Sequence, residues 1–233
     1  MPAGVGGFIS FHLPRKRKIS QWPKVILSHS KDISLHNPSF LLYNQFDKHE
    51  FVEVTMIETE RLVLRSWLET DAESLYEYAK DPAVGPIAGW PVHSSVKNSL
   101  EIIKNVLSAD ETYAVCLKTD NVAIGSIGLI TPAQTHSEAS NTELEVGYWI
   151  GVPFWGNGYI PEAIRALQKH AFEDLGCTAM WCGYYDGNEK SRRCQEKCGF
   201  KYHHTEKNKP CELMSDVRTE HFTYLTKEEW KKR

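Results

Sequence analysis

A short glycine-bearing segment, Trp155-Gly156-Asn157-Gly158-Tyr159, lies between a strand-like pattern and the best helical pattern of the chain. Glycine permits backbone conformations and close approaches that side chains prevent, so several N–H groups can converge on one anion beside the positive end of the helix. We therefore expect this loop to bind phosphate, with a plain strand-to-helix turn as the alternative. The dinucleotide fingerprint and the Lys-Ser/Thr ending of nucleotide P-loops are both missing, which favours another phosphate-bearing ligand.

Two further polar groups flank this loop in the sequence. Asn188 and Ser191 begin another helical pattern one strand later, where they could be helix caps or ligand contacts. Glu143 and Glu145 alternate along the preceding strand pattern and therefore share one face. A carboxylate at that place could take a proton from an attacking group, although a solvated strand residue is the simpler interpretation.

Strands and helices around these residues must hold them in place. Strand-like patterns cover residues 57–65, 113–118, 122–130, 143–150, 178–184, 200–204 and 220–225. Helical patterns cover residues 71–80, a stretch capped by Ser94 or Ser95, and residues 160–175 and 188–197. The order of these elements, β-α-α-β-β-β-α-β-α-β-β, predicts an α+β layer structure.

Together these segments resemble the GNAT superfamily of acyl-CoA N-acyltransferases. Besides the glycine loop and the Asn-x-x-Ser helix start, the likeness rests on I-E-T-E-R-L-V-L-R from Ile57, E-V-G-Y-W-I from Glu145, K-C-G-F from Lys197 and R-T-E-H-F-T-Y-L-T from Arg218. It covers nearly all of residues 56–233 and is strongest with the Rim-type group, the ribosomal-protein N-terminal alanine acetyltransferases. One departure is Pro153, where the superfamily often has Gln or Arg, so backbone N–H groups must carry more of the pyrophosphate recognition.

The resemblance implies a mixed, mostly antiparallel sheet that splays at an acyl-CoA cleft, with flanking helices. It implies acetyl-CoA as the acyl donor and direct transfer of the acetyl group to a primary amine. The residues expected to contact the donor are Val146, Tyr148, Trp149, Ile150, Trp155, Gly156, Asn157, Gly158, Tyr159, Ile160, Asn188 and Ser191.

The implied reaction needs a base, an oxyanion site and an acid. Glu145 is expected to take the proton of the amine, with Glu143 as a competitor for that role. A backbone N–H of residues 146–149 could hold the carbonyl oxygen. Ser191 or Tyr184 could donate a proton to the departing sulfur.

The acceptor amine is open at this point. A protein N-terminus follows from the Rim-type resemblance, whereas a small amine is favoured by the negative charge of residues 56–233, which carry 20 Lys and Arg against 26 Asp and Glu. A non-catalytic acyl-CoA-binding module is the alternative from another class of protein, and it would have no use for Glu145 or Ser191.

The composition is that of an average globular protein, with 41% hydrophobic residues and a net charge of −3, and it gives no general case for nucleic-acid binding. No apolar run approaches the roughly 20 residues of a membrane span. Six Cys are too few for a disulfide scaffold, so we expect a cytoplasmic protein, as a monomer or homodimer. Cys194 and Cys198 near His203 and His204 lack paired ligand spacing, so no metal site is expected.

Residues 1–55 differ from the rest of the chain. They carry 7 Lys and Arg against 4 Asp and Glu, and they show no sustained period of 2 or 3.6 residues. We expect residues 1–55 to be a disordered or dispensable extension, with Met56 as the native initiator, and residues 56–233 to be the acetyltransferase domain.

Overall fold

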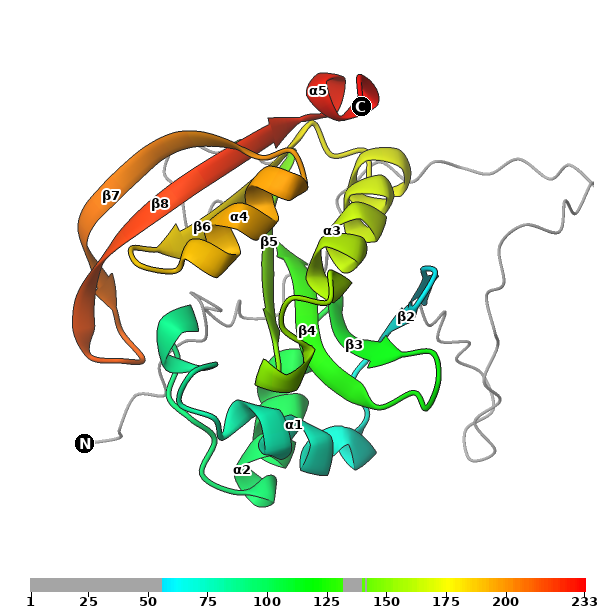
Figure 1. The fold of residues 1–233 in the computed structure, drawn as a ribbon, viewed down its shortest axis with the longest axis vertical. Coiled ribbons are helices and arrows are strands. Elements are labelled where there is room, and N and C mark those ends of the chain that lie inside the picture. Colours follow the sequence, from blue (N-terminus) through cyan, green and yellow to red (C-terminus); the bar gives the residue numbers. More distant parts are fainter. Residues whose placement is uncertain (1–55, 132–139, 141) are drawn as a thin grey trace, which may run out of the picture.

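The computed structural model describes residues 56–131, 140 and 142–233, and the predicted extension 1–55 lies outside this range. A single sheet has the strand order β1-β2-β3-β4-β5-β6-β8-β7 (Figure 1). Its strands are β1 (Ile57–Glu58), β2 (Leu62–Arg65), β3 (Thr112–Leu117), β4 (Ala123–Ile130), β5 (Glu143–Ile150), β6 (Ala179–Tyr185), β7 (Lys201–Cys211) and β8 (Asp216–Thr226). The α-helices are α1 (Ala72–Ala79), α2 (Val96–Ile102), α3 (Tyr159–Lys169), α4 (Glu189–Lys197) and α5 (Lys227–Lys231).

The two faces of the sheet bury two separate hydrophobic clusters. Leu64 and Val115 belong to the cluster that contains the buried face of α3. Ala114 and Cys116, the neighbours of Val115 in β3, belong instead to the cluster that contains Trp90 and the apolar residues of α1. This alternation is what a strand covered on both faces requires, and it makes the sheet the middle layer between the helices.

Among the described strands, β5 and β6 form the one parallel pair, and few of their residues are paired. Glu143–Glu145 pair with Ala179–Trp181, after which the two strands separate. Beyond this point β5 keeps pairing with β4 as far as Ile150, and β6 keeps pairing with β8 as far as Tyr185. The predicted mostly antiparallel sheet with a splay is therefore confirmed, and beyond residues 145 and 181 the facing edges of β5 and β6 are no longer paired with each other.

The last hairpin is longer than predicted. The sequence pattern indicated strands at 200–204 and 220–225, whereas β7 continues to Cys211 and β8 begins at Asp216. The added residues are mostly polar and include Pro210, which suits an edge strand but hides the strand pattern. The longer hairpin reaches the α1–α2 connection, where Arg218 Nη1 donates to the carbonyl of Pro86 at 2.6 Å.

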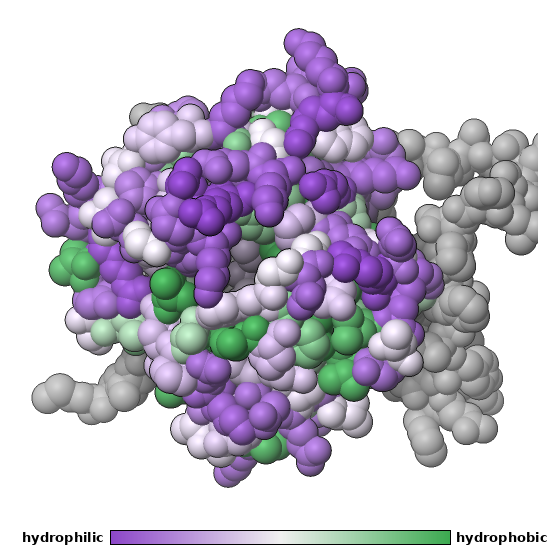
Figure 2. Space-filling model, in the orientation of Figure 1, coloured by the Kyte–Doolittle hydropathy of each residue, from purple (hydrophilic) through white to green (hydrophobic). Residues whose placement is uncertain are grey.

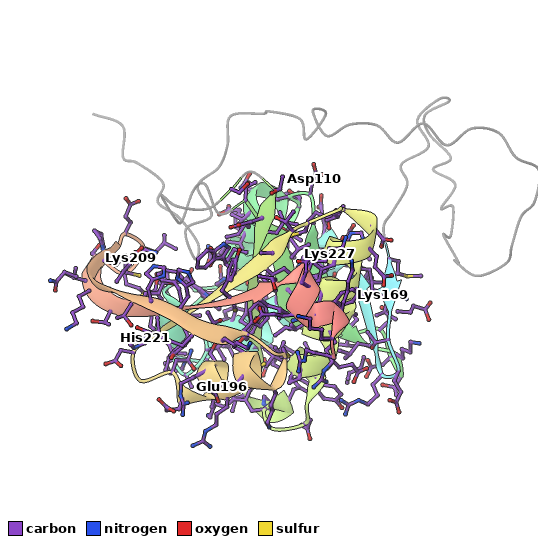
Figure 3. All side chains as sticks on the ribbon, turned by 90° about the horizontal axis from the view of Figure 1, so that it is seen from above. Asp110, Lys169, Glu196, Lys209, His221 and Lys227 are labelled. Carbon is purple, nitrogen blue, oxygen red and sulfur yellow. The ribbon has the colours of Figure 1, made fainter. Side chains whose placement is uncertain are left out.

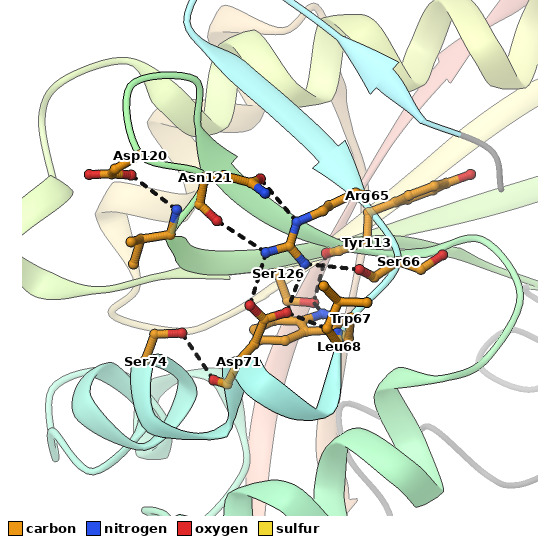
Figure 4. Close-up of polar contacts among 11 residues, drawn as sticks. Arg65, Ser66, Trp67, Leu68, Asp71, Ser74, Tyr113, Asp120, Asn121 and Ser126 are labelled. Carbon is orange, nitrogen blue, oxygen red and sulfur yellow. Dashed lines mark hydrogen bonds and ion pairs between the residues drawn. The ribbon is translucent and has the colours of Figure 1, made fainter. Parts of the chain in front are cut away.

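A buried ion pair fixes the start of the domain (Figure 4). The guanidinium of Arg65, at the end of β2, donates to both carboxylate oxygens of Asp71 at 2.7 and 2.9 Å. Asp71 also accepts from the backbone N–H of Leu68 at 2.9 Å, and Arg65 donates to Asn121 Oδ1 at 3.0 Å. The side chains of the ion pair are only 11% and 9% exposed, so this pair ties β2 to the beginning of α1 and to the β3–β4 turn.

The helix predicted at 160–175 is α3 followed by a π-helical turn, His170–Asp174. The imidazole of His170 bonds Asp174 at 2.8 Å and Glu111 at 3.1 Å. Burial lowers the pKa of His170, but these carboxylates outweigh that effect and leave the pKa raised. Across the described residues, no helix combines the length and the apolar character that crossing a bilayer would need.

Candidate functional site

The glycine loop has a left-handed backbone conformation at both of its glycines. Gly156 has φ 80° and Gly158 has φ 78°, both in the left-handed region that side chains disfavour. Gly158 is the N-cap of α3, and the first N–H groups of a helix have no partner within that helix. A Cβ built on Gly156 would meet nothing within 4 Å. The loop therefore presents backbone N–H groups to open space at the positive end of α3.

Arg61 holds this loop from outside the groove. Its Nη1 donates to the carbonyl of Asn157 at 2.9 Å, its Nε donates to Glu162 at 2.7 Å, and its guanidinium lies 4.5 Å from the ring centre of Tyr159. Burial raises the pKa of Glu162, but bonds from Thr59 and Arg61 outweigh this and lower it. The role of Arg61 was not visible in the sequence, because its partners lie about a hundred residues away.

A groove of ≈ 590 Å³ runs beside the loop toward the splay. The predicted donor contacts that line it are Tyr148, Trp149, Ile150, Trp155, Gly156, Gly158, Tyr159, Ile160, Asn188 and Ser191. Asn157 belongs to the same loop but is not among the lining residues. Figure 2 shows hydrophobic residues in a band below the hydrophilic surface of α4.

Basic residues of α4 stand along one wall of this groove, namely Lys190, Arg193 and Lys197. Lys190 Nζ lies 3.5 Å from the ring centre of Trp155, whose Nε1 donates to the carbonyl of Ile150 at 2.9 Å. Trp155 is thus fixed by its own hydrogen bond and holds a cation at the edge of the groove. An anionic ligand in the groove would meet positive charge as well as the loop N–H groups.

A second, smaller cavity of ≈ 50 Å³ lies where β5 and β6 separate. Its lining includes Glu145, Val146 and Tyr184, and it shares Tyr148, Asn188 and Ser191 with the groove, so the two spaces adjoin each other. Glu145 is 3% exposed.

Glu143 is placed differently from Glu145. Its carboxylate accepts from Trp181 Nε1 at 2.6 Å and from the hydroxyl of Tyr224 at 3.0 Å, and it lines neither space. The structure thus puts one carboxylate of the predicted pair in the cavity and uses the other to bind two aromatic side chains.

Ser191 is part of a buried chain of hydrogen bonds. Its Oγ lies 2.9 Å from the hydroxyl of Tyr148 and accepts from Gln195 Nε2 at 3.1 Å. Gln195, which is 0% exposed, also donates to the carbonyl of Gly183 at 2.9 Å and accepts from Thr223 Oγ1 at 2.7 Å. Burial raises the pKa of Tyr148 far above its ordinary value, which keeps that hydroxyl neutral. The sequence analysis missed Gln195, because only the packing of α4 on β6 and β8 reveals its partners.

The remaining predicted residues take supporting positions. Asn188 Oδ1 accepts from the backbone N–H of Ser191 at 3.1 Å and caps α4. The ring of Tyr184 lies 5.0 Å from that of His221, and burial raises the pKa of Tyr184.

The thiol of Cys182 donates to the carbonyl of Val146 at 3.3 Å. Burial and the nearby Glu145 raise the pKa of Cys182, so it stays a neutral thiol. No group of three or more His, Cys, Asp or Glu side chains in the described residues could hold a metal ion.

Comparisons with known proteins bear on the family and the fold of this chain. The family described as "Acetyltransferase (GNAT) domain" matches residues 61–201. An uncharacterized N-acetyltransferase, YoaA of Bacillus subtilis, is 27% identical over 62% of this chain and 82% of its own. A structure described as "a putative ribosomal-protein-serine acetyltransferase" of Vibrio cholerae has a TM-score of 0.61 and 21% identity, over 74% of this chain and 97% of that one. The aminoglycoside acetyltransferase AAC(6')-Ib with coenzyme A has a TM-score of 0.59 and 18% identity, over 73% and 98%. At these identities the two structures show the fold.

Proposed function

The chain belongs to the GNAT family of acetyl-CoA-dependent N-acetyltransferases, and from that premise we propose that it transfers the acetyl group directly to a primary amine. One observation supports this: the groove beside the glycine loop adjoins the smaller cavity that Glu145 lines. A thioester at the junction of the two spaces would present its carbonyl to an amine in the cavity. Holding both reactants in this way supplies much of the acceleration.

The groove offers a complementary group for each part of the donor. The N–H groups of residues 156–160 can bind the pyrophosphate, and Lys190 and Arg193 add positive charge. The amides of the pantetheine arm can bond the open backbone edge of β5 beyond Glu145, as an added strand would, together with Asn188.

Glu145 and the Ser191 hydroxyl divide the proton transfers. As the amine nitrogen bonds to the carbonyl carbon, its proton goes to Glu145 and an N–H of residues 146–149 holds the oxygen. As the carbon–sulfur bond breaks, the thiolate takes a proton from Ser191, which regains one from water when Glu145 releases the amine proton to water. Ser191 Oγ accepts from Gln195 and can accept from Tyr148, so its own hydrogen remains available to the sulfur. Tyr184, in the same cavity, is the second possible donor.

Two kinds of acceptor are proposed, a protein N-terminus and a small amine. The likeness to a structure named as a ribosomal-protein-serine acetyltransferase supports the first, and the negative charge of the domain together with the likeness to an aminoglycoside acetyltransferase supports the second. All six cysteines are free thiols, which supports a location in the reducing cytoplasm.

An acceptor screen tests the proposed function. The chain and acetyl-CoA are incubated with an amine library and with ribosomal-protein N-terminal peptides, and acetylation is read as a mass shift. We expect turnover that falls about a hundredfold in Glu145→Gln and about tenfold in Ser191→Ala, with acetyl-CoA affinity unchanged. Tight acetyl-CoA binding without transfer to any amine would contradict the proposal and would favour a non-catalytic acyl-CoA-binding module.

A further inference from the structure

The turn between β1 and β2 is fastened to the first turn of α3. Thr59 Oγ1 donates to Glu162 Oε1 at 2.5 Å, and the backbone N–H of Arg61 donates to the same oxygen at 2.8 Å. Nε and Nη2 of the Arg61 guanidinium each lie 2.7 Å from the other oxygen, Glu162 Oε2. These bonds hold the guanidinium of Arg61 beside the glycine loop, where α3 begins.

One further bond connects Arg61 to the loop itself. Arg61 Nη1 donates to the carbonyl of Asn157 at 2.9 Å. The peptide bonds of the described residues are all trans, so this carbonyl and the N–H of Gly158 point in opposite directions from one planar group. Gly158 lines the groove and Arg61 does not. The bond therefore directs the Gly158 N–H away from Arg61.

The glycines alone do not fix this peptide plane. Gly158 has φ 78°, and glycine populates positive and negative φ about equally, so the plane between Asn157 and Gly158 can invert at little steric cost. An inverted plane would turn a carbonyl oxygen toward the side where the N–H now points. A site that is ordered before its ligand arrives does not lose free energy to ordering when the ligand binds. Arg61 supplies this order.

The guanidinium of Arg61 is itself held on three sides. Glu162 binds one edge, the carbonyl of Asn157 accepts from another nitrogen, and the ring centre of Tyr159 lies 4.5 Å away. The side chain of Glu162 is 17% exposed and that of Arg61 is 43% exposed. Arginine can serve such partners together because its planar group presents several N–H groups in fixed directions.

We propose that Arg61 is a positioning residue of the acetyl-donor site, which locks the peptide between Asn157 and Gly158 so that the Gly158 N–H stays directed at the pyrophosphate of acetyl-CoA. This inference rests on the proposed function. Arg61 acts through the loop and does not touch acetyl-CoA. Its loss should therefore weaken the binding of acetyl-CoA and leave the amine and the reacting atoms unaffected.

Calorimetric titration of the full chain with acetyl-CoA tests this role. Arg61→Met keeps most of the side-chain length but removes every N–H, so Kd should rise about tenfold. Arg192→Met is the matched control and should stay within about twofold of the parental Kd. Arg192 is 38% exposed, contacts Glu189 and Glu196 at 2.7 Å, and lies outside the groove lining. Figure 3 shows Glu196 on α4.

A double variant separates positioning from a simple charge effect. Arg61→Met leaves the carboxylate of Glu162 without its cation near the proposed pyrophosphate site, and repulsion alone could weaken binding. Arg61→Met combined with Glu162→Gln removes both charges. Its Kd should remain about tenfold above that of the parent chain, because the carbonyl of Asn157 still lacks the Arg61 N–H. Recovery to within about twofold of the parental Kd would overturn the inference.

A shortened acetyl donor separates positioning from general damage to the fold. S-acetylpantetheine carries the thioester but no pyrophosphate. In Arg61→Met, kcat/KM for acetyl-CoA should fall about tenfold through KM, whereas kcat/KM for S-acetylpantetheine and the KM for the amine should stay within about twofold. Equal losses with both acetyl donors would overturn the inference.

Urea unfolding checks that Arg61→Met is folded. If it is not, Arg61→Lys replaces it, because one ammonium cannot hold Glu162 and Asn157 as the guanidinium does, and Kd should still rise about threefold. A parental Kd in the folded variant would overturn the inference and leave the proposed function standing. Absence of acetyl-CoA binding and of transfer by the parent chain would instead overturn the proposed function.

Discussion

Replacing Gln195 by Met should slow the reaction while leaving the binding of acetyl-CoA intact. The substitution keeps the side-chain volume but removes the N–H that Ser191 Oγ accepts at 3.1 Å and that the carbonyl of Gly183 accepts at 2.9 Å. Thr223 still donates to the carbonyl of Cys182 at 3.0 Å, so two polar atoms lose a donor. At about 1 kcal/mol each, the free energy of unfolding should fall by about 2 kcal/mol.

The kinetic effect should exceed what lost stability alone produces. Without Gln195 the Ser191 hydroxyl is no longer held toward the place proposed for the sulfur, and we expect kcat to fall about tenfold, which corresponds to about 1.4 kcal/mol in the barrier. Gln168→Met is the matched control, because Gln168 is also buried and donates to the carbonyl of Cys198 at 2.9 Å. Neither Gln168 nor Cys198 lines the groove or the smaller cavity. Urea unfolding and kcat are measured for both variants with the best amine of the screen. A normal kcat in Gln195→Met, or an equal loss in Gln168→Met, would refute the reasoning.

Three further outcomes follow from contacts elsewhere. Asp71→Ala removes one partner of the buried ion pair with Arg65, so urea unfolding should show a loss of about 3 kcal/mol, and a loss below about 1 kcal/mol would contradict the burial argument. The pKa of His170 is raised in the folded state, so its stabilising contribution is complete below about pH 6.5 and is lost as the pH rises through the raised pKa. His170→Gln should therefore remove the fall in unfolding free energy above about pH 6.5, and a slope equal to that of the parent chain would count against this. Cys194→Ser should keep kcat within about twofold, because direct attack needs no thiol. This should hold even though a hydrogen bond with Cys198 lowers the pKa of Cys194. Acetylated Cys194 found by mass spectrometry would contradict direct transfer.

Local features of the site could be predicted from the sequence, whereas contacts between distant segments could not. Gly156 and Gly158 could be identified because a left-handed backbone conformation before a helix favours glycine. The splay followed from the family resemblance. Gln195 could not be identified in this way, because its contacts depend on the register of β8 against β6 and on how α4 packs on both.

The outer hairpin illustrates the same limit for the fold. Hydrophobic alternation marks a strand only where one face is buried, and β7 is a largely exposed edge strand with Pro210 in it. Its length comes from pairing with β8, and its end is fixed by the contact between Arg218 and Pro86. The place where this hairpin meets the α1–α2 connection was therefore beyond what periodicity could predict.

Calorimetric titration with acetyl-CoA tests the role of the glycine loop most directly. Gly156→Ala puts a methyl group into the space where the pyrophosphate is proposed to bind and strains the backbone at φ 80°. Gly176→Ala is the control, because Gly176 has φ 69°, an equally open surrounding and no place in the groove lining. We expect Kd to rise about tenfold in Gly156→Ala and to stay at the parental value in Gly176→Ala. Parental affinity in both variants, or no binding by the parent chain, would contradict the proposal that this loop holds the acetyl donor.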